Sequence, residues 1–281
     1  MAKVLLRRLT PVLVAATAAA VLVGCSTSEP PTTTAESVSA TESTAPSVTL
    51  TPALDHLHGL HLGADGTVLA GSHTGLVAIA ADGRTTRIGT SDDDFMGLAG
   101  VPGTDHLFAS GHPGPSSSAP NPLGLMDSTD GGHTWTPTSL TGEVDFHALA
   151  TDGKVLVGFD GTTGLLVSTD VGASWSAGAP LAAAAFAVTD GGVWAATAEG
   201  LQHSTDTART FTAVPGAPRL TLLSAASDGS LWGVDSHGVA WCSRTGQTWV
   251  QHTVVGPVEA LLAVDADTAY AATSRQLYTI E

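Results

Sequence analysis

Ser128-Thr-Asp130-Gly-Gly132-His-Thr134-Trp135 is the most complete of four copies of one turn motif, which recur about every 38 residues. The other copies are Ser168-Thr-Asp170-Val-Gly172-Ala-Ser174-Trp175, Ser204-Thr-Asp206-Thr-Ala208-Arg-Thr210-Phe211 and Cys242-Ser-Arg244-Thr-Gly246-Gln-Thr248-Trp249. In a tight hairpin, the Asp carboxylate accepts backbone N–H groups, the Gly supplies a positive φ and the aromatic closes the gap to the next unit. A repeat of about 40 residues that is rich in short strands is typical of a β-propeller blade.

This pattern, Ser-x-Asp-x-Gly-x-Thr-Trp, is identified as the Asp box, also called the bacterial neuraminidase repeat. Four further stretches resemble a lipoprotein branch of the Asp-box propellers, which often carry the label glycosyl hydrolase or sialidase-like: His56-Leu-His-Gly-Leu60, Gly111-His-Pro113, Asn121-Pro-Leu-Gly-Leu125 and Asp145-Phe-His147. The resemblance implies a propeller outside the cytoplasm, leaves glycan handling open, and assigns Asp130, Asp170 and Asp206 to structural turns. Because Asp boxes occur in hydrolases and in plain binding proteins, they predict the fold rather than the function.

The N-terminal segment has the pattern of a lipoprotein signal peptide. Lys3, Arg7 and Arg8 precede an apolar run over residues 9–23, which is short for a membrane span, and Leu22-Val-Gly-Cys25 matches a lipobox. We predict a signal peptide over residues 1–25 with Cys25 as the lipid anchor. The alternative is an ordinary signal peptide with an incidental cysteine. Residues 26–47 are rich in Ser, Thr and Pro, so we expect them to form a disordered tether. The tether would join the membrane anchor to a propeller domain over residues 48–281 that faces outside the cytoplasm.

The charge balance limits the possible partners of the folded part. The chain carries a formal net charge of −16, and three of its ten basic residues precede Cys25, so the remainder carries −19. Such a charge argues against nucleic acid and anionic lipid surfaces as partners, and it favours cations. With Cys25 lipidated, Cys242 has no cysteine partner for a disulfide, and we expect it to be a small buried residue in a monomer.

The number of blades follows from a recurring apolar pattern. Residues 48–281 suffice for six blades, and the start of an innermost strand can be aligned six times, at His58, Met96, His147, Phe186, Leu223 and Glu259. We therefore predict an all-β, six-bladed propeller of four-stranded blades with almost no helix. Only three strands can follow Glu259, so we expect Ser47-Val-Thr-Leu-Thr51 to pair near Leu277–Ile280. That pairing closes the ring and hides two sheet edges.

The two faces of such a ring collect different residues. Turns between the third and fourth strands of each blade contain the Asp boxes and lie on the bottom face. The top face receives the starts of the inner strands and the ends of the second strands. Six of the eleven histidines fall in or beside these top-face positions: His56, His58, His61, His73, His112 and His147.

We expect His58, His73, His112 and His147 to converge on the mouth of the central channel, with Met96 and Glu259 in the same ring. Neutral imidazole is the commonest metal ligand. Imidazoles with a nearby carboxylate would suit Zn, Cu or Fe, and the thioether of Met96 tilts the choice toward copper. In the alternative interpretations, the histidines hydrogen-bond Asp94, Asp145 and the top-face loops, or they bind a ligand without metal.

Enzymatic activity is left open by the sequence. A sialidase-like site needs three Arg, a Tyr–Glu pair and an Asp, and this arginine-poor chain offers no matching set. Asp145, Asp160 or Glu259 could provide the carboxylate pair of another glycosidase. A third possibility is a scaffold that binds another surface protein. The Pro- and Ser-rich insertion over residues 112–122 should either cover a ligand at the channel mouth or decorate the surface.

Overall fold

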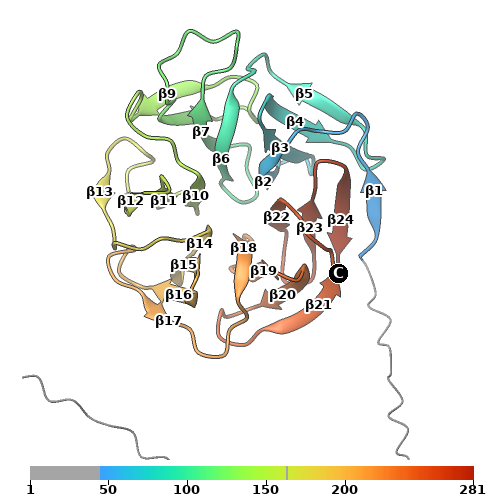
Figure 1. The fold of residues 1–281 in the computed structure, drawn as a ribbon, viewed down its shortest axis with the longest axis vertical. Helices are drawn as coiled ribbons and strands as arrows, with labels where there is room; N and C mark the ends of the chain where they lie inside the picture. Colours follow the sequence, from blue (N-terminus) through green and yellow to red (C-terminus); the bar gives the residue numbers. More distant parts are fainter. Residues whose placement is uncertain (1–44, 163) are drawn as a thin grey trace, which may run out of the picture. The chain divides into compact units, whose positions relative to one another are not determined.

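The computed structural model describes residues 45–162 and 164–281. The predicted signal peptide, Cys25 and nearly all of the predicted tether lie outside these residues. The described part consists of six four-stranded antiparallel sheets arranged around a central axis (Figure 1), which confirms the predicted six-bladed propeller. It contains no α-helix, and so no helix long and apolar enough to cross a membrane.

Each blade is a simple meander whose first strand lies innermost. The first blade consists of β2 (Leu57–Leu62), β3 (Val68–Ser72), β4 (Gly75–Ile79) and β5 (Thr85–Ile88). The second consists of β6 (Asp94–Gly100), β7 (Leu107–His112), β8 (Leu125–Ser128) and β9 (Thr136–Ser139). The third consists of β10 (Ala148–Thr151), β11 (Leu156–Phe159), β12 (Leu165–Ser168) and β13 (Ser176–Ala177). The last three are β14 (Ala185–Thr189), β15 (Gly192–Thr197), β16 (Gly200–Ser204) and β17 (Thr212–Ala213); β18 (Leu220–Ala225), β19 (Leu231–Asp235), β20 (Val239–Ser243) and β21 (Val250–Val254); and β22 (Ala260–Ala263), β23 (Ala269–Ala272) and β24 (Gln276–Ile280) with β1 (Ser47–Thr49).

The ring is closed by the N-terminal strand, as predicted. In Figure 1, β1 lies at the outer edge of the sixth blade, where Ser47 pairs with Tyr278 and Val48 with Leu277. Ala45, the first described residue, also belongs to the propeller, because it is buried and donates its N–H to Val254 O. The closure therefore combines backbone pairing with burial of apolar side chains.

Neighbouring blades pack their sheets face to face, which explains why the second strands are apolar on both sides. All five residues of β3 are buried, and fully buried side chains such as Phe95, Phe108 and Trp232 fill the spaces between the sheets. The inner strands approach so closely that a Cβ on Gly97 would lie 2.4 Å from Phe146 O of the next blade. Small residues at these positions allow six sheets to converge on the axis.

The Asp boxes are structural turns on the bottom face, as the resemblance implied. Asp130 Oδ1 accepts hydrogen bonds from the Thr134 N–H at 2.9 Å and from the Ser128 hydroxyl, and Asp130 Oδ2 accepts one from the Thr134 hydroxyl at 2.7 Å. Asp170 and Asp206 make the equivalent bonds in their own boxes. The repeated spacing thus satisfies the polar groups of each turn, and the carboxylates of Asp130, Asp170 and Asp206 are all engaged in hydrogen bonds.

Two details of the predicted box are corrected by the structure. The aromatic closes the gap to the preceding blade rather than to the next one: Trp175 of the third blade donates Nε1–H to Ser139 Oγ of the second. In the fourth box, Ser243 rather than Cys242 takes the serine role, since its hydroxyl accepts the Gly246 N–H at 2.8 Å. Cys242 is buried, and burial raises the pKa of its thiol to about 11, which fits the expected core role.

Replacing Asp130 with alanine should lower the free energy of unfolding by about 1–2 kcal/mol at pH 7. The substitution removes an acceptor from one N–H and two hydroxyls, and the cost stays at the lower end of the usual range because water can reach this exposed turn. Urea denaturation would measure the difference. If Asp130→Ala left the free energy of unfolding unchanged, the structural role of this carboxylate would be contradicted.

The effect of Asp130→Ala should also depend on pH. Hydrogen bonds from the Thr134 hydroxyl and N–H, and then from Ser128, lower the pKa of Asp130 to about 2. Because the folded state favours the charged carboxylate, its stabilisation is complete above the unfolded pKa of about 4 and is lost as the pH falls through about 2. The difference in stability between wild type and variant should therefore shrink between pH 4 and pH 2. Urea denaturation across that range would reject the hypothesis if the difference stayed constant.

Candidate metal centre

The top face brings strand ends from several blades together around a cavity of about 230 Å³ that follows the central axis. Inner strands of all six blades line this cavity, and His58, His147 and Glu259 stand at its upper end. The register of β6 and β7 places Asp94 directly opposite His112. The residues predicted for a site therefore share one face, and they fall into two clusters.

The first cluster, here called the blade-one histidine cluster, consists of three imidazoles and two carboxylates: His56, His58, His73, Asp94 and Glu259. The ring of His58 lies edge-on to both others, with centroid separations of 4.8 Å to His56 and 4.7 Å to His73. His56 and His73 are stacked at 5.7 Å. Because Asp94 comes from the second blade and Glu259 from the sixth, the cluster spans three blades and the seam where the ring closes.

Local backbone features place His58 in this position. A bulge between Leu57 and Gly59 interrupts the β2–β3 register at His58, and such bulges reorient a side chain at the end of a strand. Leu57 is buried and donates its N–H to Glu259 Oε2 at 2.8 Å, which holds the strand entrance against the sixth blade. An analogous bulge lies at Met96 in β6.

The nitrogen Nε2 of His58 is buried without a hydrogen-bond partner. Three buried side-chain polar atoms of the described residues share this condition, namely His58 Nε2, Asp145 Oδ1 and Trp135 Nε1. The His58 side chain is only 9% exposed, and its Nε2 lies 3.8 Å from Asp94 Oδ1, too far for a hydrogen bond. Burial, and then the neighbouring His56 and His73, lower the pKa of His58 to about 4. His58 is therefore a neutral imidazole at neutral pH.

The two carboxylates orient the flanking imidazoles. Asp94 Oδ1 lies 2.8 Å from Nδ1 of His73, and Glu259 Oε2 lies 3.1 Å from Nδ1 of His56. If Nδ1–H of a neutral His56 donates to Glu259, its Nε2 carries the free lone pair. This carboxylate–imidazole arrangement commonly supports metal-binding histidines.

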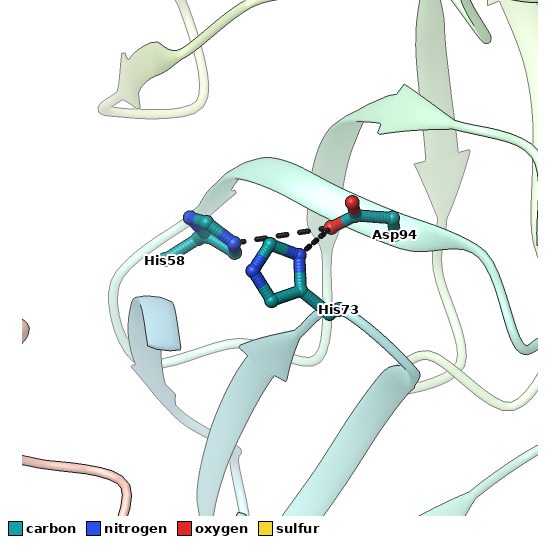
Figure 2. Close-up of side chains that lie close together, drawn as sticks. All are labelled: His58, His73 and Asp94. Carbon is teal, nitrogen blue, oxygen red and sulfur yellow. Dashed lines mark hydrogen bonds and ion pairs between the residues drawn. The ribbon is translucent and has the colours of Figure 1, made fainter. Parts of the chain in front are cut away.

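The ligand atoms of His58, His73 and Asp94 lie within 4.8 Å of one another, and they form the one such group among the described residues. Figure 2 shows the ring of His73 and the carboxylate of Asp94 on the side to which the His58 nitrogen points. Zinc ligands at about 2 Å from the ion are roughly 3.3 Å apart in a tetrahedron. The group is thus close to the size of a coordination sphere and needs only small side-chain movements to contract onto an ion.

The second cluster, here called the Asp145 cluster, lies on the second and third blades and consists of Asp145, His112, His147 and Asn121. Asp145 Oδ2 lies 3.2 Å from Nε2 of His112 and 2.9 Å from Nε2 of His147. Nδ1 of His112 bonds Asn121 Oδ1 at 2.8 Å. Asp145 and His147 flank Phe146, which is fully buried and donates its N–H to Ser110 Oγ at 2.9 Å, so the core fixes this segment.

The structure divides the predicted histidines between two clusters instead of placing them in a single ring. His58 and His73 belong to the blade-one histidine cluster, and His112 and His147 to the Asp145 cluster. Met96 occupies its bulge and is not among the residues that line the cavity. His61 is buried, and its Nε2 bonds Thr104 O at 2.7 Å, away from both clusters.

The alternative interpretation is supported at Asp94, which is hydrogen-bonded to Nδ1 of His73 at 2.8 Å. Asp145 contacts His112 and His147 at ion-pair distances. The sequence indicated Asp94 through a matched spacing, since Asp94 stands two residues before Met96 as Asp145 stands two before His147. Asn121 was indicated only within a stretch that carries the family resemblance, and its contact with His112 depends on the path of the insertion.

The insertion is fastened to the acidic segment beside it. Asp92 accepts the N–H and hydroxyl of Ser116, and Asp93 Oδ1 accepts the N–H of Gly114 at 2.9 Å. These carboxylates therefore serve the loop rather than an ion. The loop is held next to His112, to which it contributes Asn121.

The carboxylates proposed for a glycosidase are engaged in hydrogen bonds. Glu259 accepts the Leu57 N–H and contacts His56, and Asp145 contacts two imidazoles. Asp160 Oδ1 accepts the Thr162 N–H at 2.8 Å. This arrangement stabilises imidazoles and turns.

Comparison with known proteins supports the fold alone. No family model matches the chain, and no curated protein matches it. Among solved structures, it is similar to a gluconolactonase from Xanthomonas campestris (TM-score 0.62, 12% identity, covering 84% of this chain and 90% of that one). It is also similar to a GH74 enzyme from Niastella koreensis (0.57, 19%, covering 83% and 43%) and to YCF48 bound to D1 peptide (0.53, 12%, covering 84% and 96%). The chain thus spans less than half of the GH74 enzyme, and what it shares with these proteins is the β-propeller architecture.

Proposed function

We propose that this protein is a membrane-anchored binding propeller, facing outside the cytoplasm, that holds a transition-metal ion at the blade-one histidine cluster. The observation that carries this proposal is the buried Nε2 of His58, a neutral imidazole nitrogen without a hydrogen-bond partner. An unpaired buried polar atom costs free energy. A metal ion bound to its lone pair would remove that cost.

The donor set favours Cu²⁺ or Zn²⁺ over Mg²⁺ or Ca²⁺. His58 and His73 provide imidazole nitrogens, and Asp94 provides a carboxylate within the same group. Imidazole suits zinc and copper, whereas magnesium and calcium prefer oxygen ligands. His56 and Glu259 lie beside the group and would support it from the sixth-blade side. The strongly negative charge of the chain would also attract cations.

The lipobox at Cys25 supports the proposed location of the protein at the membrane. A lipid on Cys25 and a Ser-, Thr- and Pro-rich tether would hold the propeller close to the membrane surface on the outer side. In cells that produce the full chain, Cys25→Ala should move the protein from the membrane fraction to the soluble one. If the variant stayed in the membrane fraction to the same extent, the lipid-anchor proposal would be rejected.

Metal content tests the central proposal directly. The full chain, purified in detergent without a His tag, should contain copper or zinc by elemental analysis, or should take up Zn²⁺ or Cu²⁺ in a calorimetric titration after chelation and dialysis. Mg²⁺ and Ca²⁺ should give no binding heat under the same conditions. A folded chain that binds neither Zn²⁺ nor Cu²⁺ would refute the proposal.

Hydrolysis of glycans, which the sialidase-like resemblance leaves open, has weaker support. A glycosidase uses two carboxylates that face a sugar, whereas Glu259 and Asp160 accept hydrogen bonds from backbone N–H groups and Asp145 contacts two imidazoles. The similarity to a GH74 enzyme and a gluconolactonase concerns the fold. Metal binding is therefore the function that we propose.

A further inference from the structure

We infer that the Asp145 cluster is a second metal site, separate from the first, with His112, His147 and Asp145 as its ligands. The inference extends the proposed function, because the second site would take the same class of ion, Cu²⁺ or Zn²⁺. It rests on different atoms and can succeed or fail independently. Two observations carry it.

The first observation is the hydrogen bond that fixes the tautomer of His112. Asn121 Oδ1 is an acceptor, so Nδ1 of His112 donates to it at 2.8 Å. In a neutral imidazole the lone pair is then on Nε2, and this nitrogen faces Asp145 Oδ2 at 3.2 Å. A lone pair that faces a carboxylate oxygen at this distance is repelled unless a cation lies between them. That cation is either a proton or a metal ion.

The second observation concerns the other oxygen of the same carboxylate. Asp145 Oδ1 is buried and has no hydrogen-bond partner, and the side chain of Asp145 is only 14% exposed. Leaving a carboxylate oxygen unpaired and out of water is costly. A metal ion bound by both oxygens of the carboxylate would give Oδ1 the partner that it lacks.

The distances from Asp145 fit one coordination sphere. Its Oδ2 is 3.2 Å from His112 Nε2 and 2.9 Å from His147 Nε2, close to the edge of roughly 3.0–3.4 Å between ligands that surround an ion at about 2.1 Å. The three ligand atoms do not all lie within 4.8 Å of one another. The two imidazoles must therefore move toward each other when an ion binds. Their side chains are 44% and 51% exposed and are free to do so. We therefore expect the second site to bind more weakly than the first.

The two sites are neighbours on the top face. Asp94 of the first cluster and His112 of the second face each other across the β6–β7 pair. No ligand is shared in the proposed sets, so each site can be removed without deleting a ligand of the other. The top face would then carry a pair of ions across the first three blades.

Stoichiometry tests the second site. The full chain without a His tag would be stripped with chelator and titrated calorimetrically with ZnCl₂, and separately with CuSO₄ in a buffer that keeps Cu²⁺ soluble. We expect two ions per chain for the wild type, with the weaker ion lost in His147→Ala and the tighter ion lost in His73→Ala. The matched control His133→Ala, which removes an exposed bottom-face histidine, should keep both.

A second variant keeps the test decisive if His147→Ala folds poorly. Asn121→Ala removes the acceptor that fixes the His112 tautomer, and loss of such a supporting bond typically weakens metal binding about 10–100-fold. The weaker Kd should increase by that factor while the tighter Kd stays unchanged. One ion per chain that persists in His147→Ala and in Asn121→Ala would overturn the second site and leave the first intact. If the wild type bound no tight ion, or if His73→Ala retained the tight ion, the proposed function would instead be refuted.

Discussion

His58→Ala is expected to raise the Kd for Zn²⁺ at the blade-one histidine cluster by more than about 100-fold. The substitution removes a direct ligand, and even the loss of a supporting hydrogen bond to a ligand costs about 10–100-fold. His73 and Asp94 are already ligands in the proposed set, and Nδ1 of His56 is held by Glu259 at 3.1 Å, so no free imidazole replaces His58. Calorimetric titration of the metal-free full chain would measure the change.

The same variant should fold at least as well as the wild type when no metal is present. Alanine removes a buried nitrogen without a hydrogen-bond partner, so the loss of packing is offset by the loss of an unsatisfied group. Thermal denaturation in chelator should give an equal or higher Tm, whereas added Zn²⁺ should raise the Tm of the wild type more than that of the variant, which keeps only the weaker site. His133→Ala is the control that should retain full affinity. If His58→Ala bound Zn²⁺ like the wild type, the first site would be wrong.

Leu50→Ala is expected to lower the free energy of unfolding by about 2–5 kcal/mol, the range observed for buried leucines. Leu50 is 3% exposed and packs with Leu57 and Leu277, between the first blade and the sixth. Its N–H donates to Arg275 O, so it anchors the N-terminal strand at the seam. Weakening this contact should open the ring and expose the edge of β24.

Urea denaturation monitored by tryptophan fluorescence would measure this loss. Val250→Ala is the matched control, because Val250 is 57% exposed and its truncation should change stability by less than about 0.5 kcal/mol. Equal effects of the two substitutions would show that closure does not depend on the N-terminal strand.

The fold could be predicted in detail because its information is local and repeated. Each Asp box places an acceptor, a positive-φ residue and an aromatic within eight positions, and the turn that they form depends only on neighbours in sequence. The repeat length then determines the number of blades, and a last blade that lacks one strand predicts closure by the N-terminal strand. Two predicted details were wrong. The direction in which the box aromatic packs is a contact between blades. The serine role of Ser243 in the fourth box is local and depends on an irregular spacing within that turn.

The site could be predicted only in part. Alignment of the blades showed which residues reach the top face, since strand order determines the face on which a residue lies. It could not show that His58 and His73 join Asp94 while His112 and His147 join Asp145. That division depends on side-chain directions set by a bulge at His58, on a buried Phe146 and on an insertion that brings Asn121 to His112. The sequence alone therefore determined the architecture and the face, because turn hydrogen bonds and strand hydrophobicity are short-range, repeated properties. Only the tertiary structure decided the partners of each imidazole, because the contacts of His56, His73 and His112 with carboxylates join different blades at distances that no periodicity encodes.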